Sequence, residues 1–372
     1  MKPYRIIISG GGTGGHIFPA ISIANTFKRR HPDAEILFVG ADNRMEMERV
    51  PKAGYKIVGL PVSGFDRSRK LKSIAVLFRF IKSLRMAKKI IRTFKPDIAV
   101  GVGGYASAPI LWAASSLGIP TLIQEQNSYA GITNKFLGKR ADRICVAYEG
   151  MERFFPAGKI VLTGNPVRKE LEQKLEDRKT ALAHFRLQPD RKTVLLIGGS
   201  LGARTINNGV QNGLKRLTDA GIQLIWQTGK YYYPAIRQRL EQTDTGDRVW
   251  YADFITRMDY AYAAADLVVS RAGAGSVSEL CLLKKAAILI PSPNVAEDHQ
   301  TKNALAVADK GAAVVIADRD AETLLTDTIL NLISDTDKLK SLGEQIGLLA
   351  QRHSAELIAD EIEKLTLQTY KI

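Results

Sequence analysis

The sequence predicts a two-domain α/β protein whose parallel sheets are covered by helices. Short apolar runs typical of buried strands alternate with helical segments along the chain, and this alternation indicates parallel sheets with helices on both faces. Each half of the chain also opens with a strand, a glycine-rich loop and a helix. At 372 residues the chain is too long for one ordinary domain. We therefore expect two such domains facing each other across a cleft.

The first domain begins with Ile6–Ile8, three isoleucines that are typical of a short buried strand. Glycine then occupies five of the six positions 10–15, which lets the backbone turn sharply and approach a ligand. A helix is expected through Ala20–Ala24, with Pro19 in its first turn. Because the N–H groups of such a helix terminus bind anions, a phosphate or diphosphate is the expected ligand, and His16 lies at the lip of the loop.

The remaining elements follow from the same alternation. In the first half, strands are expected at 35–40, 56–60, 98–102, 121–123, 144–147 and 160–163, and helices at 45–53, 109–117 and 133–139. In the second half, strands are expected at 193–197, 223–227, 249–252, 267–270, 287–290 and 313–316, and helices at 205–220, at 259–264 and after the glycine loop 271–275. Ligands of this architecture bind beyond the carboxyl ends of the strands.

A hinge is expected at 164–168, where Gly and Pro interrupt the chain. It separates a first domain at 1–164 from a second at 165–354, and a helix at about 355–372 is a candidate to pack back on the first domain. Residues 98–124 carry no charge, but glycines and prolines interrupt them, so we expect strand, loop, helix and strand instead of a membrane span. No export signal is expected at the N-terminus. Cys145 and Cys281 are therefore expected to be reduced and buried.

The formal net charge of +15 implies an anionic partner, such as nucleic acid, a membrane surface or a phosphorylated substrate. Much of the excess lies in residues 61–100, which hold eleven Lys/Arg and two Asp. Within this stretch Ile74, Phe78 and Ile81 recur at helical spacing and predict an amphipathic helix. Its apolar face either packs inside its own domain or lies on an anionic bilayer.

The first glycine loop also fits the fingerprint Gly-x-Gly-x-x-Gly of dinucleotide-binding proteins, for which Asp42 would be the ribose-binding acid. Similar loops recur three more times, so a single fingerprint explains little of the chain. In the fourth loop, Ser276 is expected to cap the helix and Glu279 to lie in its first turn. Glu279 either compensates the helix dipole or accepts hydrogen bonds from ribose hydroxyls. Residues 298–300 form either an ordinary polar turn or a sugar-binding loop.

Six segments occur in order: GGGTGGHIFPA (10–20), GVGGYASAP (101–109), QEQN (124–127), TGNPVR (163–168), GGSLGAR (198–204) and SRAGAGSVSE (270–279). Together they resemble the MurG family of glycosyltransferase family 28, over about residues 5–320. The resemblance implies the GT-B fold, in which two Rossmann-like domains flank a cleft. It also implies an inverting transfer of N-acetylglucosamine (GlcNAc) from UDP-GlcNAc to the 4-hydroxyl of MurNAc in lipid I, which is undecaprenyl-diphospho-MurNAc-pentapeptide. The products would be lipid II, a precursor of peptidoglycan, and UDP.

The resemblance further implies roles for individual residues. Contacts with UDP-GlcNAc are implied for Thr13, Gly14, Gly15, Asn127, Arg168, Ser200, Ile255, Ala274, Gly275, Ser276, Val277, Ser278, Glu279 and Gln300. Contacts with the acceptor are implied for His16, Gly103, Gly104 and Tyr105. His299 stands where the family often has a glutamine, so we do not expect His299 itself to contact the sugar.

An inverting displacement needs a base for the acceptor hydroxyl and positive charge for the departing UDP. His16 is the expected base, because a helix N-terminus keeps an imidazole neutral. The alternative is that His16 only binds acceptor phosphate or shapes the loop, and Glu125 is the reserve base. Helix N-termini and Arg168 would stabilise UDP. Neither a metal nor another cofactor is expected, on the interpretation that no Asp-x-Asp follows a strand.

Since lipid I is held in the bilayer, the resemblance implies a peripheral protein on the cytoplasmic face of the inner membrane. Ile74, Phe78 and Ile81 would dock on its anionic surface, and other cell-wall or division proteins are candidate partners. Nucleic acid is not expected, because no sequence of the RNP type accompanies the charge. Three alternatives stay open: a GT-B transferase with another lipid or small-molecule acceptor, a non-catalytic nucleotide-sugar binder, and a nicotinamide oxidoreductase.

Overall fold

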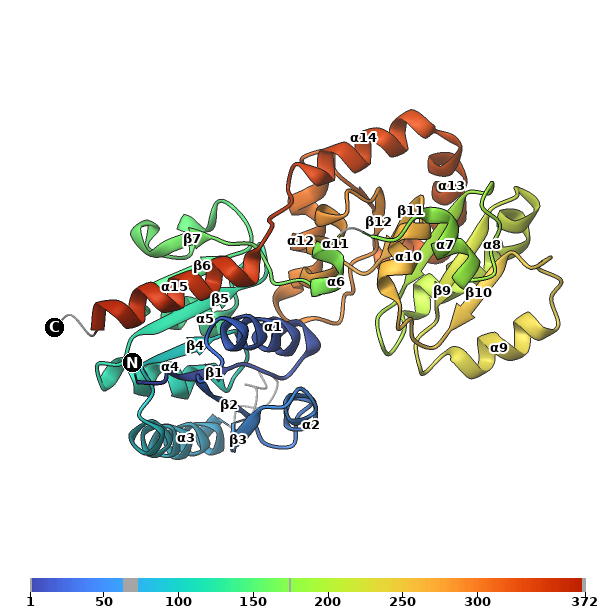
Figure 1. Cartoon of the computed structure of the whole chain (residues 1–372). Helices are drawn as coiled ribbons and strands as arrows, with labels where there is room; N and C mark the ends of the chain where they lie inside the picture. The colour runs from blue at the N-terminus through green and yellow to red at the C-terminus, as the bar shows by residue number, and fades with distance from the viewer. Residues whose placement is uncertain (1, 63–72, 174, 370–372) are drawn as a thin grey trace. The chain divides into compact units, whose positions relative to one another are not determined.

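The computed structural model describes residues 2–62, 73–173 and 175–369, and it describes no side chains at 73–79 or 369. The chain forms two compact units (Figure 1). The first comprises Met1–Val167 together with Gln351–Ile372, and the second comprises Arg168–Ala350. Each unit contains one parallel sheet, which confirms the expected α/β class.

The sheet of the first unit has seven parallel strands in the order β3-β2-β1-β4-β5-β6-β7. The strands are β1 (Arg5–Ser9), β2 (Glu35–Ala41), β3 (Lys56–Leu60), β4 (Ile98–Gly101), β5 (Thr121–Glu125), β6 (Arg143–Val146) and β7 (Ile160–Leu162). In the central strand β1, Ile7 pairs in register with Leu37 of β2 and Ala99 of β4. All seven strands lie where the sequence predicts them.

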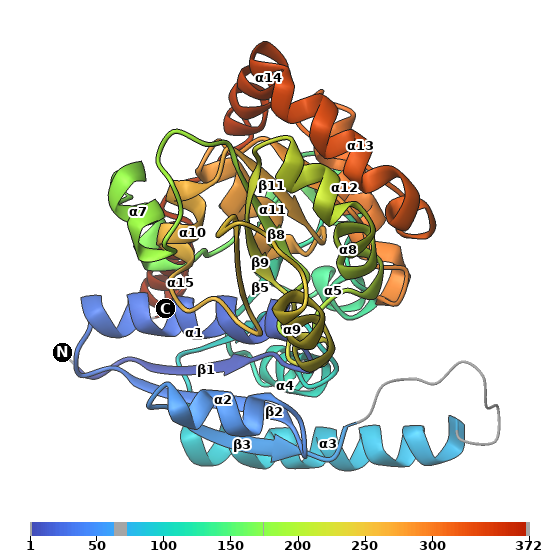
Figure 2. The ribbon, with the colours of Figure 1, turned by 90° about the vertical axis from the view of Figure 1, so that its right-hand side faces the viewer.

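Helices cover both faces of this sheet. They are α1 (Gly14–Arg30), α2 (Glu46–Lys52), α3 (Ser73–Phe94), α4 (Ser107–Ser116), α5 (Ile132–Gly138) and α15 (Ser354–Thr369), with short 3-10 turns at Met151–Arg153 and Ala157–Lys159. Ile6 and Ile8 pack into a core with α1 and α15, whereas Ile7 packs into a second core with α3 and α4. Figure 2 shows α1 and α3 on opposite sides of β1. The alternating isoleucines of β1 therefore supply both faces of the sheet.

Helix α15 is an integral part of the first unit, although it follows the second unit in sequence. Ile358 and Ile362 are fully buried in the core beneath α1. Charged residues at the end of α1 also bind it, because Arg29 forms an ion pair with Glu356 at 3.0 Å and Arg30 forms one with Asp360 at 2.6 Å. The chain thus leaves the first unit once and returns to it.

The sheet of the second unit has six parallel strands in the order β10-β9-β8-β11-β12-β13. The strands are β8 (Thr193–Ile197), β9 (Gln223–Gln227), β10 (Val249–Ala252), β11 (Leu267–Ser270), β12 (Ala287–Leu289) and β13 (Val314–Val315). The helices are α6 (Lys169–Glu172), α7 (Arg178–His184), α8 (Arg204–Asp219), α9 (Tyr233–Glu241), α10 (Met258–Ala264), α11 (Ala274–Leu282), α12 (His299–Ala308), α13 (Ala321–Ser334) and α14 (Thr336–Gly347), with 3-10 turns at Ala296–Asp298 and Asp318–Asp320. The largest fully buried side chain, Trp226 of β9, anchors the core.

Two predictions about helix starts are wrong. Helix α1 begins at Gly14, so Pro19 lies inside it and not in its first turn. The glycines at 14 and 15 adopt helical conformation despite their low helix propensity. Helix α11 begins after Gly273 with no side-chain cap, so Ser276 does not cap it. Glu279 consequently lies in the second turn of α11.

Other expectations are confirmed. Residues 98–124 form β4, α4 and β5, and none of the helices in the described part of the chain is both long and apolar enough to cross a membrane. Cys145 and Cys281 are free and buried. Burial raises the pKa of the Cys281 thiol to about 12, so this thiol stays protonated at neutral pH.

Candidate functional site

The predicted residues of the first unit lie on loops at the carboxyl ends of three neighbouring strands, β1, β4 and β5. The loops after β1 and β4 touch each other closely. Gly104 has φ +86°, and a Cβ there would lie only 2.5 Å from the carbonyl oxygen of Gly11. The side-chain amide of Gln126 donates a 2.8 Å hydrogen bond to the carbonyl of Val102, which ties the loop after β5 to the other two.

His16 is the third residue of α1 and is half-buried. Its Nδ1 lies 2.9 Å from the carbonyl oxygen of Gly11. A carbonyl oxygen can only accept, so this hydrogen bond requires the proton to be on Nδ1. In the neutral ring Nε2 then carries a lone pair. The Nε2 edge faces the loop after β4, because a Cβ at Gly103 would lie 2.9 Å from this atom. This geometry suits a base.

The neighbours of His16 are accessible. Thr13, which precedes the first residue of α1, and Gly15 are exposed. Tyr105 exposes 54% of its surface and Phe18 of α1 exposes 60%. An aromatic residue that stays largely exposed beside a polar loop is available to contact a ligand. The first unit thus presents a histidine and an exposed ring at the start of α1, and a second exposed ring on the loop after β4.

Glu125, at the end of β5, does not suit the role of reserve base. Its carboxylate is 1% exposed and accepts hydrogen bonds from four donors. They are the backbone N–H of Asn127 (3.0 Å), the amide of Asn127 (3.2 Å), the backbone N–H of Gly131 (3.0 Å) and the amide of Asn134 (2.8 Å). A buried carboxylate whose oxygens all accept hydrogen bonds in this way fixes the conformation of the loop that follows it. Glu125 therefore has a structural role in its loop and lacks a free oxygen to act as a base.

Glu46, the first residue of α2, is a site residue that sequence reasoning missed. It is fully buried and accepts hydrogen bonds from the backbone N–H of Gly12 (2.9 Å) and of Ala41 (3.0 Å). The acid that reaches the first glycine loop is therefore Glu46, whereas Asp42 is exposed. Because a carboxylate already binds the N–H of Gly12, this loop does not fit a dinucleotide pyrophosphate.

In the second unit, Glu279 forms the centre of a buried polar cluster. The hydroxyl of Tyr262 donates a 2.9 Å hydrogen bond to its Oε2, and Arg168 Nε lies 3.6 Å from its Oε1. Burial raises the pKa of Glu279, while Arg168 and Tyr262 oppose this rise. Because Oε2 is engaged by Tyr262 and Oε1 lies beside the half-exposed Arg168, Oε1 is the better placed of the two to receive a ligand hydroxyl.

The other predicted residues of the second unit lie on loops, or in the helix starts that follow them, beyond the carboxyl ends of its strands. Ser200 follows β8 and is exposed, and Gly275 in the first turn of α11 is exposed with open space where a Cβ would stand. Because β8 and β11 are neighbours, the N-termini of α8 and α11 lie at the same edge of the sheet and can bind a diphosphate. The N–H of Ile255 already donates to the side chain of Gln227 at 3.1 Å. Gln300 accepts from the N–H of Ser292 at 2.8 Å.

Asp318 and Asp320 form an Asp-x-Asp after β13, so the interpretation that no such motif follows a strand is wrong. The carboxylate of Asp318 has a structural role. It accepts hydrogen bonds from the guanidinium of Arg271 and the hydroxyl of Thr205. Arg271 also donates to the carbonyls of Ile290 (3.0 Å) and Pro291 (3.2 Å). This ion pair joins the ends of β11 and β12 to the start of α8.

Comparison with known proteins now decides the family. The family model described as "Glycosyltransferase family 28 N-terminal domain" matches residues 6–146, and that described as "Glycosyltransferase family 28 C-terminal domain" matches residues 193–362. The chain belongs to glycosyltransferase family 28. The first match lies within the first unit, whereas the second covers most of the second unit and runs on into α15 of the first.

Relatives and solved structures agree with this family. A Parabacteroides distasonis protein named "UDP-N-acetylglucosamine--N-acetylmuramyl-(pentapeptide) pyrophosphoryl-undecaprenol N-acetylglucosamine transferase" is 65% identical, covering 98% of this chain and 99% of that protein. A Bacteroides thetaiotaomicron protein of the same name is 58% identical, covering 98% of each. The crystal structure of Acinetobacter baumannii MurG matches with a TM-score of 0.79 and 28% identity, covering 97% of this chain and 100% of that one. The expected GT-B fold is thereby confirmed.

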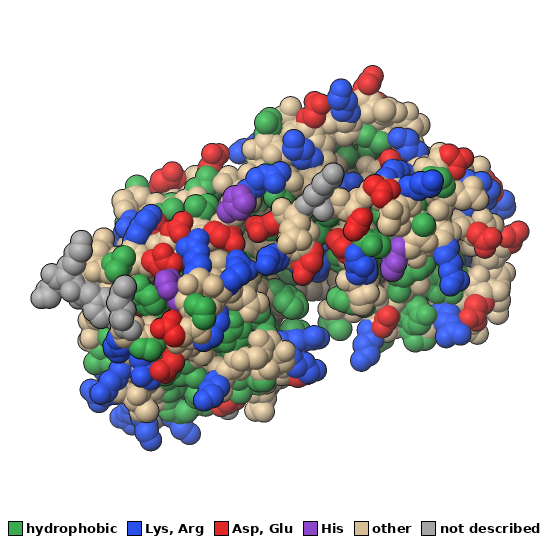
Figure 3. All heavy atoms as spheres, viewed as in Figure 1, with side chains coloured by type: hydrophobic (Ala, Val, Ile, Leu, Met, Phe, Trp, Pro, Cys, Tyr) green, Lys and Arg blue, Asp and Glu red, His purple; other side chains and the backbone are tan. Residues whose placement is uncertain are grey.

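Helix α3 is the basic segment of this family 28 chain. Blue Lys and Arg side chains gather over α3 at the lower left of Figure 3. Ile74 and Phe78 lie outside the described side chains, whereas Ile81 is described and is 39% exposed. Helix α4 packs against both α3 and α5. Its Trp112 stacks on the exposed Phe136 of α5, with 5.2 Å between the ring centres.

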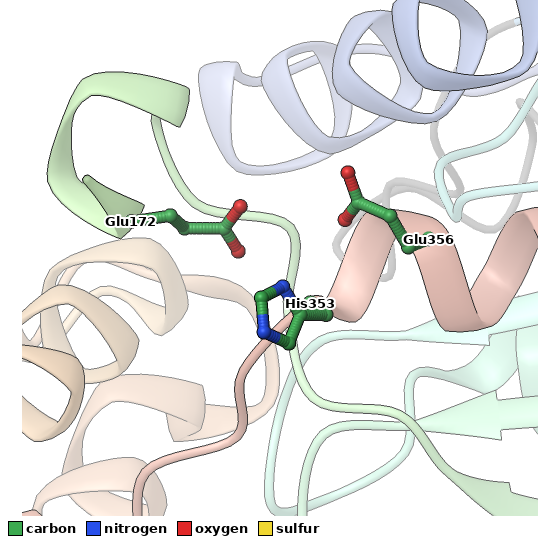
Figure 4. A group of neighbouring side chains, drawn as sticks. All are labelled: Glu172, His353 and Glu356. Carbon is green, nitrogen blue, oxygen red and sulfur yellow. The ribbon is translucent and has the colours of Figure 1, made fainter. Parts of the chain in front are cut away.

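Figure 4 shows three further titratable side chains, Glu172 of α6 and the pair His353 and Glu356 at the start of α15. Glu172 belongs to the second unit and the other two belong to the first. Glu356 is already engaged by Arg29 at 3.0 Å. We assign no metal to these residues.

Proposed function

We propose that this chain transfers GlcNAc from UDP-GlcNAc to the 4-hydroxyl of MurNAc in lipid I, forming lipid II and UDP. The observation that carries the proposal is the 65% identity, over 98% of the chain, to a protein bearing the name of this transferase. The loops of each unit offer groups that suit the two substrates. The anomeric carbon would be inverted by a single displacement.

The donor belongs to the loops of the second unit. The N-termini of α8 and α11 would bind the diphosphate through Ser200 and the backbone of 274–278. Glu279 Oε1 would accept hydrogen bonds from the ribose hydroxyls, and Arg168, 3.6 Å from that oxygen, would stabilise the charge of the departing UDP. Ile255 would meet the uracil, and Gln300 the hydroxyls of GlcNAc.

The acceptor belongs to the loops of the first unit. His16 Nε2 would take the proton from the 4-hydroxyl as the new glycosidic bond forms, since its Nδ1 is occupied by Gly11. Gly103, Gly104 and Tyr105 would contact the rest of lipid I. Thr13, Gly14, Gly15 and Asn127 would approach the donor sugar from this side.

The surface over α3–α5 would hold the protein on the membrane that contains lipid I. We define this α3–α5 surface by the apolar residues Ile81, Trp112 and Phe136 and the basic residues Lys82, Arg85 and Arg140. Arg140 stacks on Trp112 at 3.9 Å from the ring centre, so an apolar ring and a cation lie together. Such a surface suits an anionic bilayer on the cytoplasmic side.

The deciding experiment measures transfer of labelled GlcNAc from UDP-GlcNAc to lipid I in detergent or vesicles. We expect lipid II and UDP in equal amounts, and strong loss with Glu279→Ala but not with Glu241→Ala, a change at an exposed acid of α9. Transfer to another lipid or small-molecule acceptor in place of lipid I would favour the alternative GT-B function. Binding of UDP-GlcNAc without transfer to any acceptor would indicate a non-catalytic binder.

A further inference from the structure

Glu46 lies directly beneath the glycine loop that carries His16. Its side chain is fully buried, and its two oxygens each accept one backbone N–H, Oε2 from Gly12 at 2.9 Å and Oε1 from Ala41 at 3.0 Å. A carboxylate at this position holds the two N–H groups more strongly than a neutral side chain would, because hydrogen bonds to a charged acceptor are stronger.

One peptide group joins Glu46 to His16. The peptide between Gly11 and Gly12 donates its N–H to Glu46 Oε2. The carbonyl of the same peptide accepts the proton of His16 Nδ1 at 2.9 Å. Carboxylate, peptide and imidazole therefore form a continuous chain of two hydrogen bonds.

We propose that Glu46 is a positioning residue for His16 and acts through the Gly11–Gly12 peptide. The inference rests on the proposed function, in which His16 is the base. A carboxylate at the N–H end of a peptide polarises the group and strengthens its carbonyl as an acceptor. The strengthened carbonyl holds the proton on Nδ1 and fixes the ring, which leaves the Nε2 lone pair for the acceptor hydroxyl. Carboxylates that orient a functional histidine directly work in the same way.

The surrounding backbone is shaped to this carboxylate. A Cβ at Gly11 would lie 2.0 Å from Glu46 Oε1, and a Cβ at Gly40 would lie 2.5 Å from Glu46 Cγ. Glycine is needed at both positions because Glu46 fills the space. The loop thus keeps its contact with His16 only while the side chain at position 46 has this size and this charge.

The first test is a double-mutant cycle on GlcNAc transfer. Glu46→Gln keeps the shape of the side chain but replaces one carboxylate oxygen with an NH2 group. That group cannot accept the backbone N–H that the oxygen accepted. We expect kcat to fall roughly tenfold or more, with KM for UDP-GlcNAc unchanged. In a His16→Ala background, Glu46→Gln should cause no further loss of kcat. An equal loss in both backgrounds would overturn the proposal and show a merely structural role.

The second test does not depend on activity. Nitrogen-15 NMR of the His16 ring, assigned with His16→Ala, should show a protonated Nδ1 and a bare Nε2 in the wild-type protein, and a mixture of tautomers in Glu46→Gln. A wild-type ring protonated on Nε2 would overturn the proposal even if the variant does not fold. Asp97→Asn is the matched control, since Asp97 accepts the N–H of Arg5 (2.8 Å) at the opposite end of β1. It should change neither the spectrum nor kcat. If the tautomers behave as expected but lipid I is not a substrate, only the proposed function fails.

Discussion

The hydroxyl of Tyr262 donates a 2.9 Å hydrogen bond to Oε2 of Glu279, and both side chains are buried. Tyr262→Phe removes that donor and leaves a buried carboxylate less well satisfied. The pKa of Glu279, already raised by burial, would rise further. We expect KM for UDP-GlcNAc to increase roughly tenfold, as for loss of one hydrogen bond to a charged group, with kcat little changed.

The same variant predicts a pH effect with a definite sign. Ribose hydroxyls need the ionised carboxylate, so KM for UDP-GlcNAc should rise as pH falls through the raised pKa of Glu279. In Tyr262→Phe that rise should begin at a higher pH. Tyr260→Phe is the control, because Tyr260 lies on the same helix but packs on Arg257. A pH profile identical to the wild type would contradict this account.

His16→Ala should lower kcat by ~10²-fold or more, because general-base catalysis contributes about that much. Steady-state kinetics with lipid I and UDP-GlcNAc measure the effect. Unchanged kcat with a raised KM for lipid I would mean that His16 only binds the acceptor. Circular dichroism of the variant is the control for folding, since the ring also contacts Gly11.

Glu125→Gln should act mainly on stability. The amide can no longer accept four hydrogen bonds, and its NH2 group would face two N–H donors whichever oxygen it replaces. We expect the free energy of unfolding to fall by about 2 kcal/mol or more, with kcat retained in the fraction that stays folded. Thermal melting and kinetics at low temperature measure the two effects. Loss of kcat by 10²-fold with normal melting would restore Glu125 as a base.

Membrane attachment should depend on the α3–α5 surface. Ile81→Ser combined with Phe136→Ser should weaken sedimentation with vesicles that contain anionic lipid, and wild-type binding should weaken as salt rises. The control is Leu324→Ser, because Leu324 of α13 is also an exposed apolar residue at 50%. If wild-type binding changes neither with salt nor with the content of anionic lipid, this surface does not bind the membrane through its charge.

Lys285 is partly buried, and desolvation of its amine lowers its pKa to about 8. The unfolded chain keeps this proton up to about pH 10.5, so the free energy of unfolding rises with pH between 8 and 10.5. Lys285→Met removes a penalty of about 3 kcal/mol at pH 7, less the lost bond to Ala265.

The gain from Lys285→Met should therefore be largest at pH 7 and shrink by pH 10. Urea denaturation at both pH values, followed by tryptophan fluorescence, measures it. The exposed neighbour Lys284, changed to Met, should show no such dependence. A gain that is equal at the two pH values would refute the role of burial.

The strands were predictable because a parallel sheet buried on both faces demands short apolar runs, and every run predicted to be a strand is one. The helix starts were harder. Gly14 and Gly15 have low helix propensity, yet they form the first turn of α1 because tertiary packing outweighs propensity. The sequence pattern pointed to Asp42 for the acid beside the first loop, whereas Glu46 reaches it, because only the fold brings the start of α2 beneath Gly12.

The partners of Glu125 and Glu279 were equally hidden. Asn134 lies nine residues from Glu125 and Tyr262 lies seventeen residues from Glu279, and neither spacing belongs to a motif. Sequence segments indicated which loops carry the chemistry. They did not indicate which carboxylates are free to react and which hold the backbone, since that depends on burial and on the number of donors.

The return of α15 to the first unit has a consequence for synthesis. Residues 168–350 are contiguous, so the second unit can fold as soon as that stretch has left the ribosome. The first unit lacks Ile358 and Ile362 until α15 is made, so the core that α1 shares with α15 stays incomplete for all that time. During translation the earlier-made unit is therefore the later to be completed, and its open core is where chaperones would bind the nascent chain.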